Sequence, residues 1–135
     1  PGAAAAVEAI RASETPVCVA SSGSLEKMNL TLSLTGLKAY FGDNLFSADM
    51  VAHGKPEPDL FLYAAEQMGQ VPENCVVVED TLLGVTAAVA AGMRALAYTG
   101  EVEADALKAA GAQPFERMAD LPGLIGLKPA LSLVE

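Results

Sequence analysis

Basic residues are scarce in this sequence of 135 residues. Lysine and arginine number 8, against 17 aspartates and glutamates, and the formal net charge is −9. The few basic residues are scattered along the chain, so we expect no nucleic-acid partner and no anionic membrane partner. A small anion can still bind, because a local group of donors can overcome the average field of the protein.

Long hydrophobic runs are also missing, although hydrophobic residues make up 52% of the chain. No run approaches the ~18 residues that span a bilayer. The alanine-rich start is too short for a signal peptide, and no basic residue precedes it. We therefore expect a cytoplasmic, globular chain with one core.

Cysteine is rare, with only Cys18 and Cys75 in the whole sequence. The two residues are far apart, and each lies among β-branched residues. This setting favours two buried core thiols in a reducing compartment over a disulfide or a metal pair.

Short apolar runs alternate with helical patterns along the chain. The strand candidates are residues 16–20, 45–47, 76–78 and 95–98. Helical patterns cover residues 2–12, 25–36, 59–68, 83–91, 103–110 and 121–127. This order predicts an α/β fold, a Rossmann-like three-layer α/β/α arrangement whose parallel strands end at one ligand-binding edge. Residues 128–135 are expected to be loosely held.

The first candidate site is the turn from Ser21 to Ser24. It follows a predicted buried strand and opens a predicted helix, so backbone N–H groups and the positive helix end can cradle an anion. The hydroxyls of Ser21 and Ser22 add donors, and Gly23 allows close approach. An ordinary turn capped by Ser24 would give the same pattern.

The second and third candidates are a lysine and an acidic pair. Lys55 lies in a loop stiffened by two prolines, where a fixed ammonium can neutralise phosphate charge. Glu79 and Asp80 follow the run 76–78 directly, and two carboxylates at a buried strand end need donors or a cation such as Mg²⁺. Taken singly, the lysine can be solvated and the acids can simply favour the dipole of the next helix.

Together, the serine turn, the lysine and the acidic pair resemble the haloacid dehalogenase-like (HAD) hydrolase superfamily, in particular its phosphoglycolate phosphatase and β-phosphoglucomutase type. The resemblance is carried by residues 17–23, 54–61, 76–85 and 90–93. It implies a Mg²⁺-dependent phosphohydrolase that acts on a small phosphorylated metabolite, such as a sugar phosphate or phosphoglycolate.

The resemblance also implies a role for each candidate residue. The Ser21 hydroxyl would bind the transferring phosphoryl group, helped by the amide of Ser22 or Gly23. Lys55 would bridge the phosphoryl group and a nucleophilic aspartate. Asp80 would bind Mg²⁺ directly, and Glu79 would bind it directly or through water. Lysine and metal would offset the charge around an aspartyl-phosphate intermediate.

The Asp-x-Asp element that carries the nucleophile in this superfamily is missing from the sequence. The spaced acid pairs, at positions 57/59, 101/103 and 103/105, neither follow an apolar strand run nor precede Ser21. The resemblance therefore implies that residues 1–135 are the C-terminal part of the core domain, without the nucleophile strand and the cap. The absent strand would lie between the strand that ends at Ser21 and the strand that ends before Asp80.

Three explanations for this absence stay open: a missing N-terminal segment, a partner chain that supplies the strand, or a non-catalytic relative. The cap, which is not in this sequence, would decide between a phosphatase and a β-phosphoglucomutase-type phosphomutase. A dehalogenase has no use for the acidic pair. A regulatory receiver domain would place its acids before its lysine, the reverse of the order found. His53 and Asp59 are best interpreted as a solvated loop residue and a first-turn acid.

Overall fold

The computed structural model describes residues 3–12, 16–99, 104–125 and 132–133. Within them, one parallel sheet has the strand order β2-β1-β6-β3-β4-β5. The strands are β1 (Cys18–Ser21), β2 (Leu45–Ser47), β3 (Val76–Glu79), β4 (Arg94–Tyr98), β5 (Gln113–Phe115) and β6 (Ser132–Leu133). The parallel sheet confirms the predicted α/β class.

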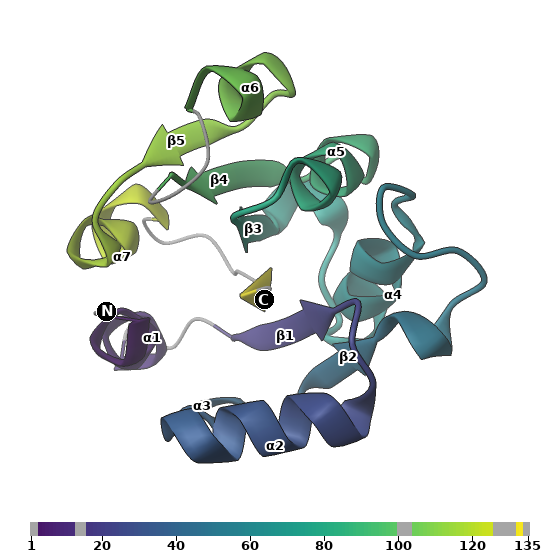
Figure 1. Ribbon diagram of the computed structural model, residues 1–135, viewed down its shortest axis with the longest axis vertical. Helices are drawn as coiled ribbons and strands as arrows, with labels where there is room; N and C mark the ends of the chain where they lie inside the picture. The colour runs from purple at the N-terminus through teal and green to yellow at the C-terminus, as the bar shows by residue number, and fades with distance from the viewer. Residues whose placement is uncertain (1–2, 13–15, 100–103, 126–131, 134–135) are drawn as a thin grey trace.

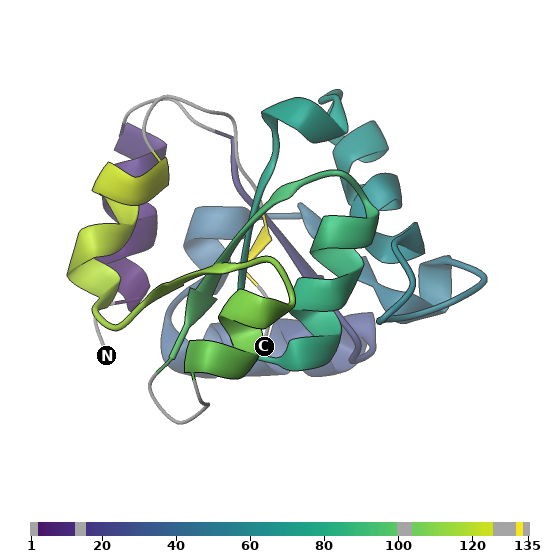
Figure 2. The same cartoon turned by 90° about the horizontal axis from the view of Figure 1, so that it is seen from above.

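Helices cover both faces of this sheet. One face carries α4 (Asp59–Gln67), α5 (Leu82–Ala90) and α6 (Ala104–Ala109). The other carries α1 (Ala3–Ala12), α2 (Leu25–Thr35), α3 (Lys38–Phe41) and α7 (Leu121–Ile125). Figures 1 and 2 show α1 beside α7 on one side of the molecule, with α4 and α5 on the other. Short 3-10 turns at Ala48–Met50, Pro72–Asn74 and Met118–Asp120 complete the connections.

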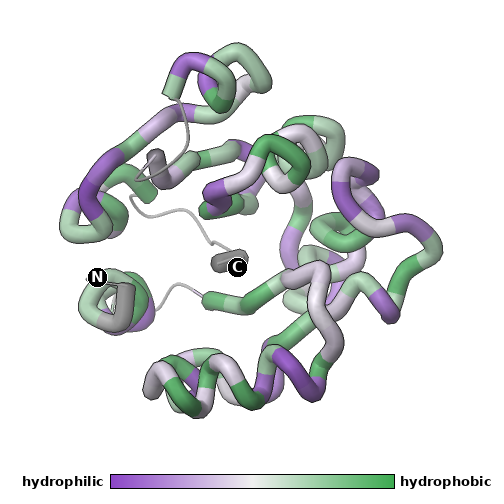
Figure 3. The backbone as a smooth tube through the Cα atoms, in the orientation of Figure 1, coloured by the Kyte–Doolittle hydropathy of each residue, from purple (hydrophilic) through white to green (hydrophobic). Residues whose placement is uncertain are grey.

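The continuous apolar runs arise because both faces are covered. In β3, Val77 packs in the core beneath α4 and α5, whereas Val76 and Val78 pack in the core beneath α1 and α7. Successive strand residues point to opposite faces, so a strand buried on both sides needs apolar residues at every position. Figure 3 shows β1 as hydrophobic almost to its end, while hydrophilic and hydrophobic residues alternate along α2.

The helix ends follow local chemistry. Ser24 caps α2, because its hydroxyl accepts the N–H of Lys27 at 3.1 Å, as the sequence predicts. Gly36 ends the same helix with φ of 77°, a conformation that glycine adopts at little cost. In the described part of the chain, no helix combines the length and the apolar character that crossing a membrane requires. Both cysteines are buried and neither forms a disulfide, as predicted.

The sequence did not predict three elements: α3, β5 and β6. The expectation that residues 128–135 are loosely held is wrong for Ser132 and Leu133, which form β6. Ser132 aligns with Cys18 and Val77, and Leu133 aligns with Val19 and Val78, so β6 pairs with both neighbours. The other residues of that tail lie outside the described part. β6 therefore occupies the place between β1 and β3 where the sequence predicted an absent strand.

Candidate functional site

The serine turn begins at the buried carboxyl end of β1. Ser21 is buried, and its hydroxyl accepts the N–H of Gly23 at 3.1 Å. The hydroxyl of Ser47, at the end of β2, donates to the carbonyl of Gly23 at 2.7 Å and fixes the turn from the neighbouring strand. Ser22 is exposed. As the acceptor in its bond, the Ser21 hydroxyl can still donate its own proton to an anion.

Lys55 is a buried lysine, not a solvated one. Its side chain is 5% exposed, and Nζ lies 5.0 Å from the centre of the Phe61 ring. The ammonium donates to the Ala20 carbonyl at 3.3 Å and to Glu79 Oε2 at 3.1 Å. Lys55 therefore links the end of β1 to the end of β3.

Glu79 has no exposed side-chain surface, and both of its oxygens are engaged. Oε2 accepts from Lys55, while Oε1 accepts the Asp80 N–H at 3.2 Å and the Thr81 hydroxyl at 3.1 Å. A buried carboxylate needs such donors, because transfer out of water without them is costly. These contacts hold Glu79 as the fixed partner of Lys55.

Burial acts on both members of this pair. It raises the pKa of Glu79, against the opposing effect of Lys55 and the other hydrogen-bond donors. It lowers the pKa of Lys55, against the opposing effect of Glu79 and Asp80. The attraction between the two charges is the main interaction that offsets the cost of burying each of them.

Two further residues shape the Glu79 environment. Thr81 caps α5, because its hydroxyl accepts the Gly84 N–H at 3.1 Å while donating to Glu79. A Cβ on Gly84 would lie 1.9 Å from Glu79 Cδ, which no side chain can tolerate. The sequence analysis missed both residues, although a threonine at a strand-to-helix turn and a glycine inside a helix are visible signals.

Asp80 differs from its neighbour. Its Oδ1 is buried and has no hydrogen-bond partner among the described residues. An orphaned buried carboxylate oxygen is costly and fits a cation ligand. The described part of the chain contains no group of three or more His, Cys, Asp or Glu residues that could by itself hold a metal ion. Mg²⁺ needs only one or two protein carboxylates beside water and phosphate, so Asp80 suits it as one ligand of an incomplete set.

The structure thus brings the three predicted stretches to one edge of the sheet. Lys55 contacts the residue before Ser21 and the residue before Asp80. His53 is exposed, as expected of a solvated loop residue, and Asp59 is the first residue of α4, as expected of a first-turn acid. A donor-rich turn, a buried ammonium and an orphaned carboxylate oxygen at the same edge suit an anion bound together with a metal ion.

Comparison with known families agrees with this arrangement. The profile of haloacid dehalogenase-like hydrolases matches residues 1–92. The chain belongs to the haloacid dehalogenase-like hydrolase family. It is 32% identical over 123 residues to 6-phosphogluconate phosphatase of Escherichia coli. This match covers 91% of this chain and 54% of that protein. It is 40% identical over 111 residues to the chloroplastic protein Suppressor of Quenching 1 of Arabidopsis thaliana. This match covers 82% of this chain and 10% of that protein.

The likeness extends to solved structures of the family. A HAD family hydrolase from Deinococcus radiodurans, crystallised with bound phosphate and sodium, is 34% identical and superposes with a TM-score of 0.85. The match covers 96% of this chain and 61% of that one. The chain therefore spans about half the length of 6-phosphogluconate phosphatase and less than two thirds of this solved relative.

Proposed function

We propose that this chain forms the phosphate-binding and metal-binding half of an active site that hydrolyses the phosphate ester of a small metabolite, such as a sugar phosphate. The catalytic group it lacks is a nucleophilic aspartate, which a segment outside these 135 residues would supply. Residues 1–135 are then the C-terminal part of a HAD core domain. The likeness to 6-phosphogluconate phosphatase supports this substrate class.

The observation that carries the proposal is the bridge made by Lys55. Its ammonium spans from the Ala20 carbonyl to the Glu79 carboxylate, across the sheet position between β1 and β3. A charge fixed there faces any group at the carboxyl end of a strand in that position. An ammonium held in place needs little reorganisation when negative charge develops on a transferring phosphoryl group.

Glu79 and Asp80 would have different roles in the site. Glu79 orients Lys55 through direct contact, so its effect on a metal ion would be exerted through water rather than as a direct ligand. Asp80 would hold Mg²⁺ through its unpartnered Oδ1. When bound, the metal ion would neutralise phosphate charge. The Ser21 hydroxyl and the amide of Ser22 or Gly23 would bind the phosphoryl oxygens.

The phosphoryl group would pass through an aspartyl phosphate on the absent nucleophile. Lys55 is placed to offset the charge of that carboxylate and of the phosphoryl group together. Two buried thiols outside any disulfide support a reducing, cytoplasmic location. We name phosphohydrolysis on the likeness to 6-phosphogluconate phosphatase. A β-phosphoglucomutase-type phosphomutase is the alternative, and a cap outside this sequence would decide between them.

Magnesium titration tests the metal role. We expect Asp80→Asn to weaken Mg²⁺ binding to the chain by about tenfold or more, since it removes a charged ligand. Asp105→Asn, at an exposed position on α6, is the matched control and should leave the affinity unchanged. Equal affinities for the two variants, measured by calorimetry, would rule out Asp80 as a metal ligand.

Phosphatase assays test the catalytic role. The 135-residue chain alone should release little or no phosphate from sugar phosphates, whereas the complete gene product should turn them over with Mg²⁺. Turnover by the chain alone would disprove the external nucleophile. Absence of turnover by the complete gene product would instead identify a non-catalytic binding module.

A further inference from the structure

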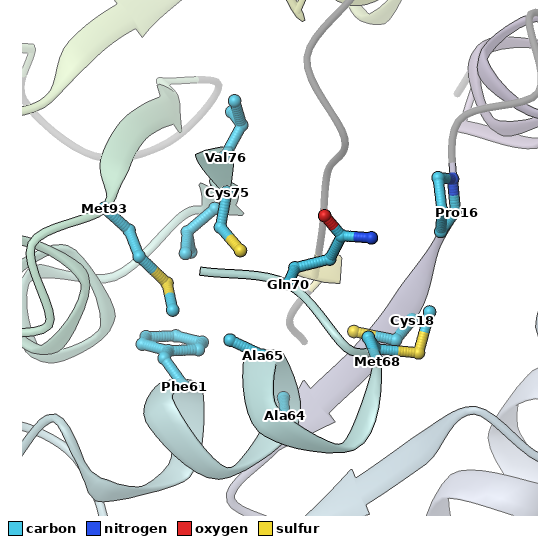
Figure 4. Close-up of a pocket in the computed structure, with 11 residues that line it drawn as sticks. Pro16, Cys18, Phe61, Ala64, Ala65, Met68, Gln70, Cys75, Val76 and Met93 are labelled. Carbon is cyan, nitrogen blue, oxygen red and sulfur yellow. The ribbon is translucent and has the colours of Figure 1, made fainter. Parts of the chain in front are cut away.

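Phe61, in the first turn of α4, lies directly beside the candidate site but takes no part in the proposed function. Its side chain is 1% exposed and belongs to the core beneath α4 and α5. Figure 4 shows the ring on α4 with the end of Met93 directed toward it, and both residues belong to that core. Most buried aromatic rings only fill space. The contact with Lys55 distinguishes this one.

The Lys55 ammonium lies over the ring of Phe61, with Nζ 5.0 Å from the ring centre. The face of an aromatic ring carries negative charge density, and it attracts a cation within about 6 Å. This attraction is larger where water is excluded, and the Lys55 side chain is only 5% exposed. The ring therefore holds the ammonium electrostatically as well as by packing.

The ring supports the ammonium without using any of its hydrogen-bond donors. A lysine ammonium has three N–H groups. Two of them donate to the Ala20 carbonyl at 3.3 Å and to Glu79 Oε2 at 3.1 Å. Among the described residues, one N–H is then left for an anion. The ring adds a third point of contact and leaves this donor available.

The local sequence places the lysine over this ring. Lys55 lies in a turn that the N–H of Glu57 closes by donating to the Gly54 carbonyl at 3.0 Å, and α4 begins directly after it. The two prolines of the segment stiffen the connection. The lysine can therefore lie over the first turn of the helix that follows it, where Phe61 is held in the core.

We propose that Phe61 is a positioning residue whose ring face holds the Lys55 ammonium at the place where the lysine meets a bound anion. Phe61 acts through Lys55 and does not itself touch the anion. Because the ring is fixed in the core, the ammonium needs little reorganisation when negative charge develops beside it. The effect of this contact on phosphoryl transfer rests on the proposed function.

Fluorination of the ring separates the electrostatic contact from simple packing. Fluorine withdraws electron density from the ring face, whereas the shape of the side chain changes little. The experiment replaces Phe61 in the full chain with phenylalanines that carry one, two or three fluorines. Trifluorophenylalanine at Phe115 is the matched control, because that ring is also buried but lies on β5 against Tyr98.

The first measurement is the hydrogen-exchange rate of the Lys55 ammonium, followed by NMR in the 135-residue chain. Three fluorines on Phe61 should raise this rate about fivefold, and one or two should raise it less, because a weaker ring contact frees the ammonium for exchange. The amides of β3 should keep their protection, and the Phe115 control should not change the rate. Equal ammonium exchange rates across the fluorine series would overturn the proposal.

The second measurement is turnover of a sugar phosphate by the complete gene product with Mg²⁺. Three fluorines on Phe61 should lower kcat about fivefold and leave KM nearly unchanged, because the ammonium matters most when charge develops in the transition state. In an active enzyme, a kcat that does not respond to fluorine would refute the positioning role. An inactive gene product whose Lys55 exchange still responds would contradict the proposed function and support the ring contact.

Discussion

At the residue scale, the decisive group is the Glu79 carboxylate. It accepts from Lys55, Asp80 and Thr81 and has no exposed side-chain surface. A buried charge of this kind is costly to leave unpaired, so the residues around it are closely constrained. Gly84 is the clearest case, because its backbone lies against the carboxylate.

Gly84→Ala should lower the free energy of unfolding by about 2 kcal/mol, because the new Cβ would overlap Glu79 and displace it. Gly123→Ala, in α7, is the matched control, since a Cβ there meets nothing within 4 Å. That control should raise the stability by about 0.5 kcal/mol through loss of unfolded-state entropy. Urea unfolding measures both, and similar effects of the two substitutions would contradict the steric argument.

The buried pair also predicts a pH dependence. Because the pKa of Glu79 is raised in the fold, the stability it contributes at low pH is lost as the pH rises through that value. The lowered pKa of Lys55 means that stability present at high pH is lost as the pH falls through its folded value. Between the folded-state pKa of Glu79 and that of Lys55, both groups are charged and buried. In this pH range the wild-type chain should have a lower free energy of unfolding than a Lys55→Met/Glu79→Gln double variant. Urea unfolding from pH 4 upward should show this difference grow toward neutral pH, and a constant difference would contradict it.

The sequence predicted the common sheet edge of the candidate residues but not their contacts. The order of Ser21, Lys55 and Asp80 at successive unit ends was enough to predict that their segments lie at one edge, and Lys55 indeed contacts Ala20 and Glu79, the residues before the other two. The burial of Lys55 was not predictable, because a lone loop lysine is usually solvated and the packing of Phe61 beneath it depends on the fold. Likewise, two adjacent acids look alike in sequence, and only geometry distinguishes the engaged Glu79 from the orphaned Asp80 oxygen.

At the scale of elements, the N-terminus of α5 has two functions. The Thr81 hydroxyl caps the helix and also donates to Glu79, whereas Ser24 at the start of α2 makes the capping bond alone. These two helix starts form a natural comparison. Because of the extra bond, Thr81 should contribute more than Ser24 to the free energy of unfolding.

Thr81→Ala should lower the unfolding free energy by about 1 kcal/mol more than Ser24→Ala, because it removes a cap and a donor to a buried carboxylate. Thr81→Ser retains both bonds and should recover most of the loss. Chemical denaturation of the three variants gives the comparison. Equal losses for the two alanine variants would mean that the Thr81–Glu79 bond contributes nothing to stability.

The elements that sequence reasoning found are those with a strong pattern of their own. The β-branched runs of β1 and β3 and the helical period of α4 indicate their structures directly. β5 escaped because it is three residues long and contains Pro114, which is tolerated only at a sheet edge. β6 was not predicted because its two described residues are too short a run to indicate a strand.

At the scale of the whole molecule, the sheet consists of two groups of strands joined through β6. β1 and β2 form one group, and β3, β4 and β5 form the other. The α/β class and the common strand edge were predictable, because alternating segments and right-handed crossovers leave few topologies. That a distant segment would connect the groups was not predictable, since pairing between remote segments depends on the space the rest of the fold leaves.

The positions of the two cysteines give this architecture an internal reporter. Cys18 belongs to the first group of strands, and Cys75 directly precedes the second. Burial raises the pKa of Cys18 to about 12 and also raises that of Cys75, so neither forms the reactive thiolate readily while the groups stay joined. Since the sequence has no other cysteine, the modification rate of the unaltered chain by a thiol reagent measures how often its two halves part.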